Sequence, residues 1–252
     1  MVKSINNSKV RMKLQRKKVN GNFINVYETQ RIILGFTEID FSFTDLSRLF
    51  GPCKLIELEQ VHSDIIHISS QIEPGSEGDG IILDQTNTMA VIETADCTPL
   101  FFWYHDNTDC SIGGVIHIGW RGLLKGIEKK LLELLAENFV NIDIRRLNVF
   151  LGPSIEKNCY EVGPDLYEMF SSKTYRNDIF SLVDTRGPGK NKYLLDVKKG
   201  IRLSLEESGI PGQQIWESGL CTFCEKDRFP SYRRCPIPGK RIYNFLLLKT
   251  HH

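Results

Sequence analysis

The chain has 252 residues, 41% hydrophobic and 25% charged, which is enough apolar material for a substantial core. A net charge of +1 argues against nucleic acid or an anionic membrane as partner, and no apolar run reaches the ~18 residues that a membrane span needs. The start "MVKSINNSKV" lacks the apolar region of a secretory signal, so the seven cysteines are expected to be thiols or ligands in a cytoplasmic protein.

Most of the predicted elements are strands. Segment 1–20 is basic, but Val10, Met12 and Leu14 alternate with polar residues, which predicts a half-exposed edge strand in place of a nucleic-acid arm. Apolar or alternating runs predict further strands at 23–29, 54–68, 89–96, 99–105, 113–120, 147–153, 179–184, 215–219 and 241–248. Several of them follow one another without a helix between, which favours mixed sheets over a doubly wound parallel sheet.

Three helices are predicted, at 123–139, 163–172 and 191–210. In the first, apolar residues share one face at a spacing of 3.6 residues, and charged residues lie opposite. The apolar residues are Leu123, Leu124, Ile127, Leu131, Leu134 and Leu135; the charged ones are Glu128, Lys129, Lys130 and Glu133. Because no repeat or linker interrupts the chain, we expect one α/β (α+β) domain over 1–252, with mixed β-sheets and helices packed outside them.

The segment "GGVIHIGWRGLLKGI" places polar side chains where a strand meets a helix. His117 shares a strand face with Val115 and Gly119, and by itself it is typical of a hydrogen-bonded core histidine. Arg121 falls in the first helical turn, where the helix dipole disfavours a cation. An anion held by Arg121 would explain this placement, and an ion pair with a nearby carboxylate is the alternative.

Two more segments concentrate polar groups. In "LEQVHSDIIHI", His62 and His67 are five residues apart on the predicted strand, so they face opposite sides and cannot share a site. In "VIETADCTPLFFW", Asp96 and Cys97 lie between two apolar strands. His62, Cys97 and His117 match no local metal-binding spacing. They would suit zinc with one open position, or a Cys-His nucleophile pair, and a buried Cys97 with no function is the third interpretation.

Five motifs resemble, in their order, a family of proteins variously called YfiH-like, laccase-domain, multicopper polyphenol oxidase or peptidoglycan-editing-factor proteins. They are "EQVHS", "ETADCTPLFFW", "VIHIGWRGLLKGI", "LGPSIEKNCYEVG" and "ESGLCTFCEKDRFPSYRR", and they span the chain from about residue 54 to its end. The resemblance implies a mixed sheet sandwich flanked by helices. It also implies a zinc site made by His62, Cys97 and His117, with copper as the alternative ion.

The function that this resemblance implies is phosphorolysis of adenosine, inosine, guanosine and methylthioadenosine, with adenosine deamination besides. The partners would be a small purine nucleoside and phosphate, and the protein a monomer or homodimer. Arg121 would orient phosphate, and Asp96 would transfer protons or, as the alternative, hydrogen-bond a metal-bound histidine. Oxidase chemistry at several coppers needs many histidines, and outside the terminal pair this chain has four.

Other residues are weaker candidates. Residues 30–53 depart from the family's usual Gly-Gly-x-Ser loop and keep "GFT" and Arg48, a candidate for substrate binding. Glu161 and Phe223 are further substrate-binding candidates, and Tyr160 would stack on the base as an alternative to Phe223. Arg233 and Arg234 offer charge for anions, with surface salt bridging as the alternative, favoured for Arg234. Cys221 and Cys224 form a Cys-x-x-Cys pair without a second pair nearby, so we expect a structural or cavity-wall role.

Two further classes of function remain open at this point. A metal-free hydrolase of amide or ester bonds, acting on peptidoglycan precursors, would use Cys97 as nucleophile and His117 as base. A binding domain that has lost activity would hold at most a zinc ion.

Overall fold

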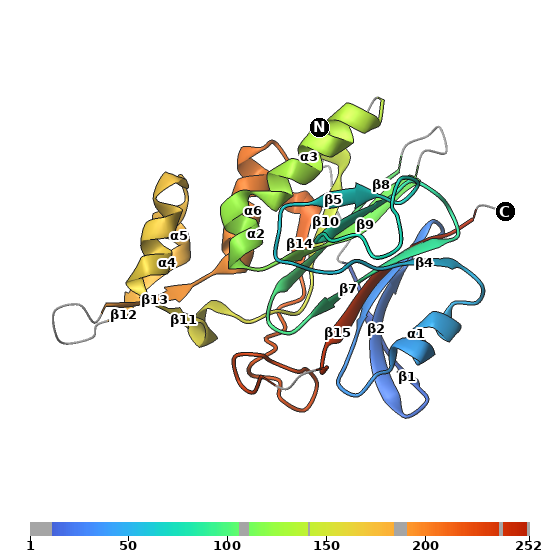
Figure 1. Cartoon of the computed structure of the whole chain (residues 1–252), viewed down its shortest axis with the longest axis horizontal. Helices are drawn as coiled ribbons and strands as arrows, with labels where there is room; N and C mark the ends of the chain where they lie inside the picture. Colours follow the sequence, from blue (N-terminus) through green and yellow to red (C-terminus); the bar gives the residue numbers. More distant parts are fainter. Residues whose placement is uncertain (1–11, 106–110, 141, 184–190, 237–238, 251–252) are drawn as a thin grey trace, which may run out of the picture.

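The computed structural model describes residues 12–105, 111–140, 142–183, 191–236 and 239–250 (Figure 1). A first six-stranded sheet has the order β1-β2-β3-β15-β7-β4, a second the order β14-β10-β8-β9-β6-β5, and a small third sheet the order β11-β13-β12. The first sheet contains β1 Gln15–Val19, β2 Asn22–Glu28, β3 Ile32–Thr37, β4 Lys54–Ile56, β7 Thr88–Thr94 and β15 Ile242–Leu248. The second contains β5 Ile66–Ile68, β6 Gly80–Leu83, β8 Thr98–His105, β9 Ser111–Ile118, β10 Asn148–Leu151 and β14 Ile215–Glu217. The third contains β11 Glu161–Val162, β12 Phe180–Val183 and β13 Lys192–Leu195.

Both large sheets are mixed, as the sequence predicted. β4 runs parallel to β7, β5 parallel to β6, and β10 parallel to β14, whereas the other pairs are antiparallel. The last strand, β15, lies inside the first sheet between β3 and β7. The C-terminal part of the chain therefore completes a sheet that the N-terminal part begins.

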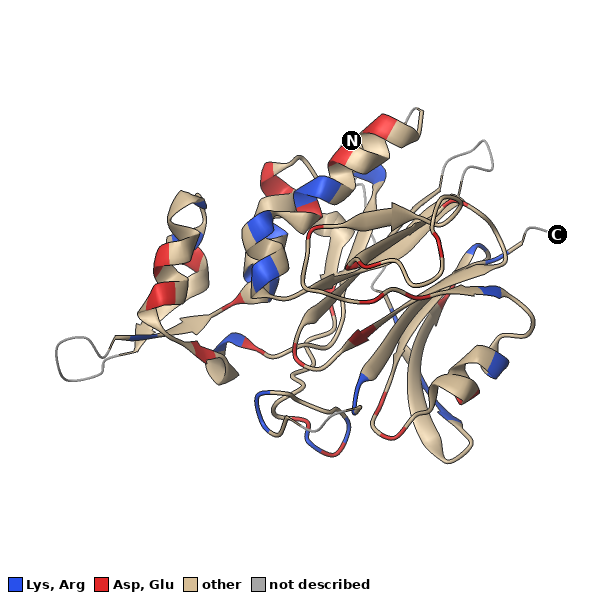
Figure 2. Ribbon diagram, in the orientation of Figure 1, with Lys and Arg blue, Asp and Glu red and all other residues tan. Residues whose placement is uncertain are grey.

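The helices are α1 Phe43–Leu49, α2 Trp120–Lys125, α3 Ile127–Asn138, α4 Pro164–Met169, α5 Arg176–Ile179 and α6 Val197–Glu207. In Figure 1, α1 lies beside the first sheet, α2, α3 and α6 lie against the second, and α4 and α5 lie beside the small third sheet. Among the described residues no helix is long and apolar enough to cross a membrane. Acidic and basic residues occur together on the helices and on the loops (Figure 2).

The core is divided among three clusters that follow these layers. The inner faces of the two large sheets meet in one cluster, which joins Leu34 and Leu246 of the first sheet to Phe101 and Val115 of the second. The other face of the second sheet packs on the helices, with Phe102 and Ile116 against Leu123, Ile127 and Leu131. The second sheet is thus covered on both faces, which explains why β8 and β9 read as continuous apolar runs.

Three predicted elements differ from the structure. Segment 54–68 is two short strands joined by a loop, not one strand, because its polar centre pairs with carboxylate and backbone groups of other segments. Residues 192–195 at the start of the predicted helix 191–210 form strand β13, paired with β11 and β12. The helix predicted over 123–139 begins earlier, at Trp120, and is interrupted at Gly126, which adopts φ 84°.

The first helical region also contains an exception to its charged face. Glu128 is fully buried and accepts a hydrogen bond of 2.6 Å from Ser204 Oγ on α6, and burial raises the pKa of its carboxyl. The edge strand predicted near the N-terminus is confirmed as β1, at the edge of the first sheet. It begins at Gln15, after Met12 and Leu14, while residues 1–11, with Val10, lie outside the described residues.

Candidate metal centre and cavity

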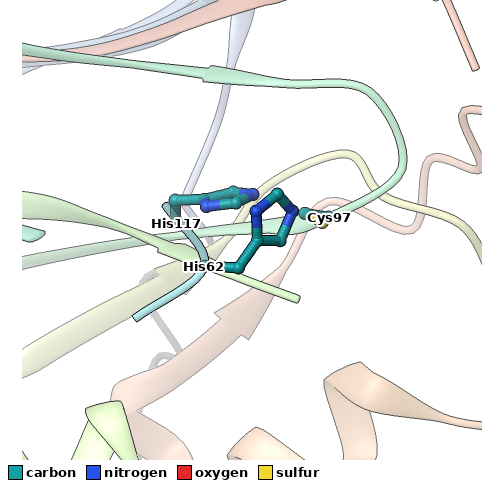
Figure 3. Close-up of side chains that lie close together, drawn as sticks. All are labelled: His62, Cys97 and His117. Carbon is teal, nitrogen blue, oxygen red and sulfur yellow. The ribbon is translucent and has the colours of Figure 1, made fainter. Parts of the chain in front are cut away.

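Three side chains from separate parts of the chain lie close together (Figure 3). His62 lies in the loop between β4 and β5, Cys97 in the turn between β7 and β8, and His117 near the end of β9. One ligand atom of each lies within 4.8 Å of the others, and the two imidazole rings meet edge to face with centroids 4.8 Å apart. Two nitrogens and a thiolate so arranged suit zinc with a fourth position left open.

Cys97 reaches the histidines because the backbone comes very close to it at Gly119. A Cβ on Gly119 would lie 2.9 Å from the Cys97 sulfur and 3.5 Å from His62 Cδ2. Atoms at the first of these separations would overlap, so a side chain at position 119 would push the thiol out of the site. This close approach explains the glycine that follows the strand in "HIGWRG".

The loop that carries His62 is held in place by Gln60. The Gln60 side-chain amide donates to Glu93 O at 2.8 Å, and its carbonyl accepts from Glu93 N at 2.6 Å. β4 pairs with β7 through backbone hydrogen bonds, and further along β7 the Gln60 side chain takes the place of such a backbone partner. His62 itself has φ 57° and Asp96 has φ 90°, left-handed conformations that are uncommon outside glycine and that gather at functional sites.

Asp79, directly before β6, connects the two histidines. Its fully buried carboxylate accepts from His117 Nδ1 at 2.7 Å, from His62 N at 3.1 Å and from Ser63 Oγ at 2.7 Å. Burial alone would raise the pKa of Asp79, but these hydrogen bonds lower it to about 2, so the carboxylate is ionised. An ionised acceptor at Nδ1 places the proton there and leaves Nε2 of His117 free to bind a metal.

The charges of the site favour the thiolate form of Cys97. Burial would raise the pKa of the thiol, but His117 and His62 beside it lower that pKa below its usual value. Burial would likewise lower the pKa of His117, but Cys97 and Asp79 raise it. The thiolate is the form that binds a metal and also the form that attacks an electrophile.

The three side chains lie in the wall of a cavity of about 930 Å³. This volume is in the range of small-molecule sites and leaves room for a nucleoside and phosphate together. Arg121, for which we expect an anion-binding role from the sequence, lines the cavity, and its guanidinium lies 4.3 Å from the centroid of the Trp120 ring. No ion pair joins Arg121 to a carboxylate among the residues that the structure describes, so the alternative of a structural salt bridge finds no support there.

Asp96 also lines the cavity, but Asp79 takes the hydrogen bond to the histidine. The Asp96 carboxylate accepts from Thr222 Oγ1 at 2.6 Å, from Ser231 Oγ at 3.0 Å and from Arg233 N at 2.7 Å. A carboxylate has about four acceptor positions, so one remains for a further donor. Asp96 therefore joins the loop after β14 to the turn that carries Cys97.

The two arginines of "SYRR" have different places. Arg233 lines the cavity, with its guanidinium 5.0 Å from the centroid of the Tyr160 ring, which also lines it. Arg234 is not among the residues that line this cavity. Its guanidinium donates to the backbone oxygens of Thr222, Phe223 and Phe229. It fastens its own loop, so the salt bridging favoured for Arg234 is replaced by contacts with neutral carbonyls.

The three weaker candidates lie outside the residues that line this cavity. Arg48 is exposed in the last turn of α1, whose first residue Phe43 does line it. Glu161 is exposed on β11 with Lys192 Nζ at 3.6 Å. Phe223 is half-buried in the loop after β14, where its carbonyl holds Arg234.

Sequence reasoning missed Asp79 and the role of Gln60. Asp79 is 38 residues from His117 in the chain, and its only local signal is an acidic residue between two glycines. Asp79 lies in a loop directly before an apolar run, and residues in loops next to strands often belong to functional sites. This is the signal in the sequence that could have found Asp79. Gln60 belongs to the motif "EQVHS". Its role was missed because a side chain that hydrogen-bonds to the backbone of a strand leaves no recognisable sequence pattern.

A family model described as multi-copper polyphenol oxidoreductase laccase matches residues 44–248. A purine nucleoside phosphorylase of Aquifex aeolicus is 36% identical over 207 residues, which are 82% of this chain and 86% of that protein. The adenosine deaminase RL5 of an unknown prokaryotic organism is 31% identical over 179 residues, 70% of this chain and 65% of that protein.

The fold has a counterpart among solved structures. The crystal structure of the hypothetical protein YfiH from Bacillus licheniformis superposes with a TM-score of 0.75 and 22% sequence identity. The match covers 90% of this chain and 96% of the other. The mixed sheets flanked by helices are therefore the architecture of that protein too.

Proposed function

This chain belongs to the multi-copper polyphenol oxidoreductase laccase family, and on that premise we propose that it is a zinc-dependent purine nucleoside phosphorylase that also deaminates adenosine. Its substrates would be adenosine, inosine, guanosine and methylthioadenosine. The single observation that carries the proposal is the convergence of His62, Cys97 and His117 in the wall of a nucleoside-sized cavity. The names of the relatives from Aquifex aeolicus and of RL5 supply the two reactions.

The donor set supports zinc more than the copper chemistry in the family description. Two imidazoles and one thiolate leave a fourth position, whereas multicopper oxidation needs many histidines. When bound, the ion would supply Lewis acidity that polarises a water or a phosphate group. Copper is the alternative ion, and metal analysis of the isolated protein distinguishes the two.

Residues that line the cavity would bind the phosphate, hold the purine and transfer the proton. Arg121 and Arg233 would bind and orient phosphate from the cavity wall, because a planar guanidinium matches phosphate oxygens. Tyr160 would stack on the purine. Asp96, held by three donors with one acceptor position left, would accept a proton from the attacking phosphate and pass it to the departing base. The substrate is thus a small molecule. We further propose a cytoplasmic, reducing compartment, because thiols that must bind metal would be oxidised elsewhere.

The test is adenosine turnover followed by chromatography, with and without phosphate. We expect adenine and ribose 1-phosphate only with phosphate, and inosine with ammonia also without it. Cys97→Ser should lose both products together with its zinc, whereas Cys53→Ser, a cysteine that does not line the cavity, should keep them. No product from wild-type protein of known zinc content would exclude this function for the chain.

One observation favours a second candidate function. Cys97 hydrogen-bonds His117, and the thiolate form of this cysteine is favoured, which is the arrangement of a Cys-His nucleophile. A hydrolase of amide or ester bonds built on this pair needs no metal. Turnover of an activated ester that survives complete removal of metal by a chelator would favour the hydrolase, and loss of activity with the metal would exclude it.

A further inference from the structure

A second group of metal-binding side chains lies apart from the first, in the segments that hold the cavity wall. Cys159, Cys221 and Cys224 place their sulfur atoms within 4.8 Å of one another, and the Cys159 and Cys224 sulfurs are 3.3 Å apart. Cys159 closes a short 3-10 turn, Lys157–Cys159, and lies 65 residues before Cys224. The third thiol that the Cys-x-x-Cys pair lacks locally is therefore supplied by a distant segment.

Cys221 is held in place by backbone N–H groups of two segments. Cys221 is buried, and its sulfur accepts a backbone hydrogen bond from Glu156 N at 3.5 Å and others from the amides of Phe223 and Cys224. These donors hold the Cys221 sulfur beside the sulfurs of Cys159 and Cys224.

We propose that Cys159, Cys221 and Cys224 bind a second zinc ion, distinct from the ion at His62, Cys97 and His117. Zinc–thiolate bonds of about 2.3 Å in a tetrahedral arrangement place sulfurs about 3.8 Å apart. This is longer than the 3.3 Å between Cys159 and Cys224 and shorter than the 4.8 Å within which all three sulfurs lie. Zinc takes the place of the three thiol protons, which leave to solvent, and water completes the coordination on the side of the exposed Cys224. Among the described residues no fourth protein ligand joins this group.

The neighbours of the three cysteines show what this ion does. Tyr160, next to Cys159, lines the cavity, and Thr222, next to Cys221, donates to Asp96 beside Cys97. Residues Ser154 and Cys221 already form a parallel bridge between the same two segments. The second ion thus fastens the wall that carries Tyr160 to the loop that carries Arg233, and it acts on the shape of the cavity without taking part in the chemistry.

The experiment measures zinc per chain in protein that has been stripped of metal and dialysed against zinc under a non-chelating reductant, without oxygen. We expect one ion for each of the two groups in the wild-type protein. Cys224→Ser and Cys159→Ser should each lose one ion and keep the other, and Cys97→Ser should lose the other ion. Cys235→Ser removes an exposed cysteine outside both groups and should keep the wild-type content.

Cobalt in place of zinc gives a second readout, because sulfur-to-cobalt charge transfer reports thiolate ligands. The band should persist in Cys97→Ser and weaken strongly in Cys224→Ser, with unchanged circular dichroism in both. A wild-type protein that binds a single ion, lost in Cys97→Ser, would overturn the proposal, as would full zinc content in Cys224→Ser. If thiol counting shows a Cys159–Cys224 disulfide that persists under reductant, the group is a redox pair and the proposal is wrong. Each of these outcomes is independent of whether the protein turns over nucleosides.

Discussion

At the scale of single residues, the candidate metal centre depends on residues besides His62, Cys97 and His117. His62 and Asp96 both hold left-handed backbone conformations, which cost about 1 kcal/mol or more each in a non-glycine residue. Asp79 stabilises the first by accepting from the His62 amide, and three donors stabilise the second through the Asp96 carboxylate. These hydrogen bonds therefore hold the loops that carry His62 and Cys97 in the conformation of the candidate site.

Asp79→Asn tests this organisation. An amide at position 79 would turn an N–H group toward donors of Ser63 or His117, so one hydrogen bond is lost and the histidine tautomer is no longer fixed. We expect zinc affinity to fall by about 10- to 100-fold. The measurement is competition with a chromophoric chelator.

A matched control lies at the other end of β6. Asp84 also accepts from serine side chains, Ser69 and Ser70, but it is not in contact with the metal ligands. Asp84→Asn should leave zinc affinity unchanged, although it lowers stability. Equal affinities for Asp79→Asn and Asp84→Asn would contradict the role given to Asp79.

At the scale of elements, one glycine decides how the helix after β9 runs. Gly126 has φ 84° and its N–H donates to the carbonyls of Gly122 and Leu123, so it ends α2 and begins α3. The break lets Leu123 and Ile127 both reach the helical core cluster while Arg121 stays at the cavity. The apolar spacing predicted one continuous helix, which would not need a left-handed residue at position 126.

Gly126→Ala should therefore destabilise the protein by about 1 kcal/mol, because a Cβ disfavours the left-handed conformation. A steric clash is not the cause, since the nearest atom to that Cβ would be Lys173 Nζ at 3.7 Å. Gly126→Asn should cost less, because asparagine tolerates this conformation. Urea unfolding of the three proteins checks the order, and an alanine variant as stable as wild type would contradict it.

At the scale of the whole molecule, Glu38 gathers partners from both ends of the chain. Its carboxylate is 3% exposed and accepts from Arg16 of β1, Asn25 of β2 and Arg228 of the loop after β14. Burial would raise the pKa of Glu38, but these donors lower it to about 2. Together with the position of β15, this contact leads us to expect that the chain unfolds as a single domain.

The pH dependence follows from the direction of that shift. The folded pKa of Glu38, about 2, is below its ordinary value of 4.5, so the ionised carboxylate stabilises the protein fully above pH 4.5, and this stabilisation is lost as the pH falls toward 2. Glu38→Gln should lower the free energy of unfolding at pH 7 by about 2 to 3 kcal/mol.

The same variant should also lose less stability than wild type between pH 4.5 and 2. Urea unfolding at several pH values measures both effects. Glu28→Gln removes an exposed pair with Lys249 and should change stability by less than about 0.5 kcal/mol. Two separate unfolding transitions would count against a single domain. An equal dependence of stability on pH in wild type and Glu38→Gln would count against the role given to Glu38.

The sequence by itself determined what depends on neighbours along the chain. Period-two and apolar runs located most strands, the face of β9 that carries His117, and the apolar face of α2 and α3. The resemblance of the motifs around His62, Cys97 and His117 to a known family singled out three candidate metal ligands, and the structure brings these side chains together. The strand and helix patterns succeed because side-chain periodicity reports local backbone geometry directly.

The tertiary structure alone decided which distant residues meet. It placed His62 in a loop, Asp79 against His117, and Cys159 beside Cys221 and Cys224, while Arg48, Glu161 and Phe223 fell outside the cavity wall. The physical reason is that these contacts depend on the order of strands in two sheets and on the register between them. No pattern within one segment contains that register, because it is set by packing among segments far apart in the chain.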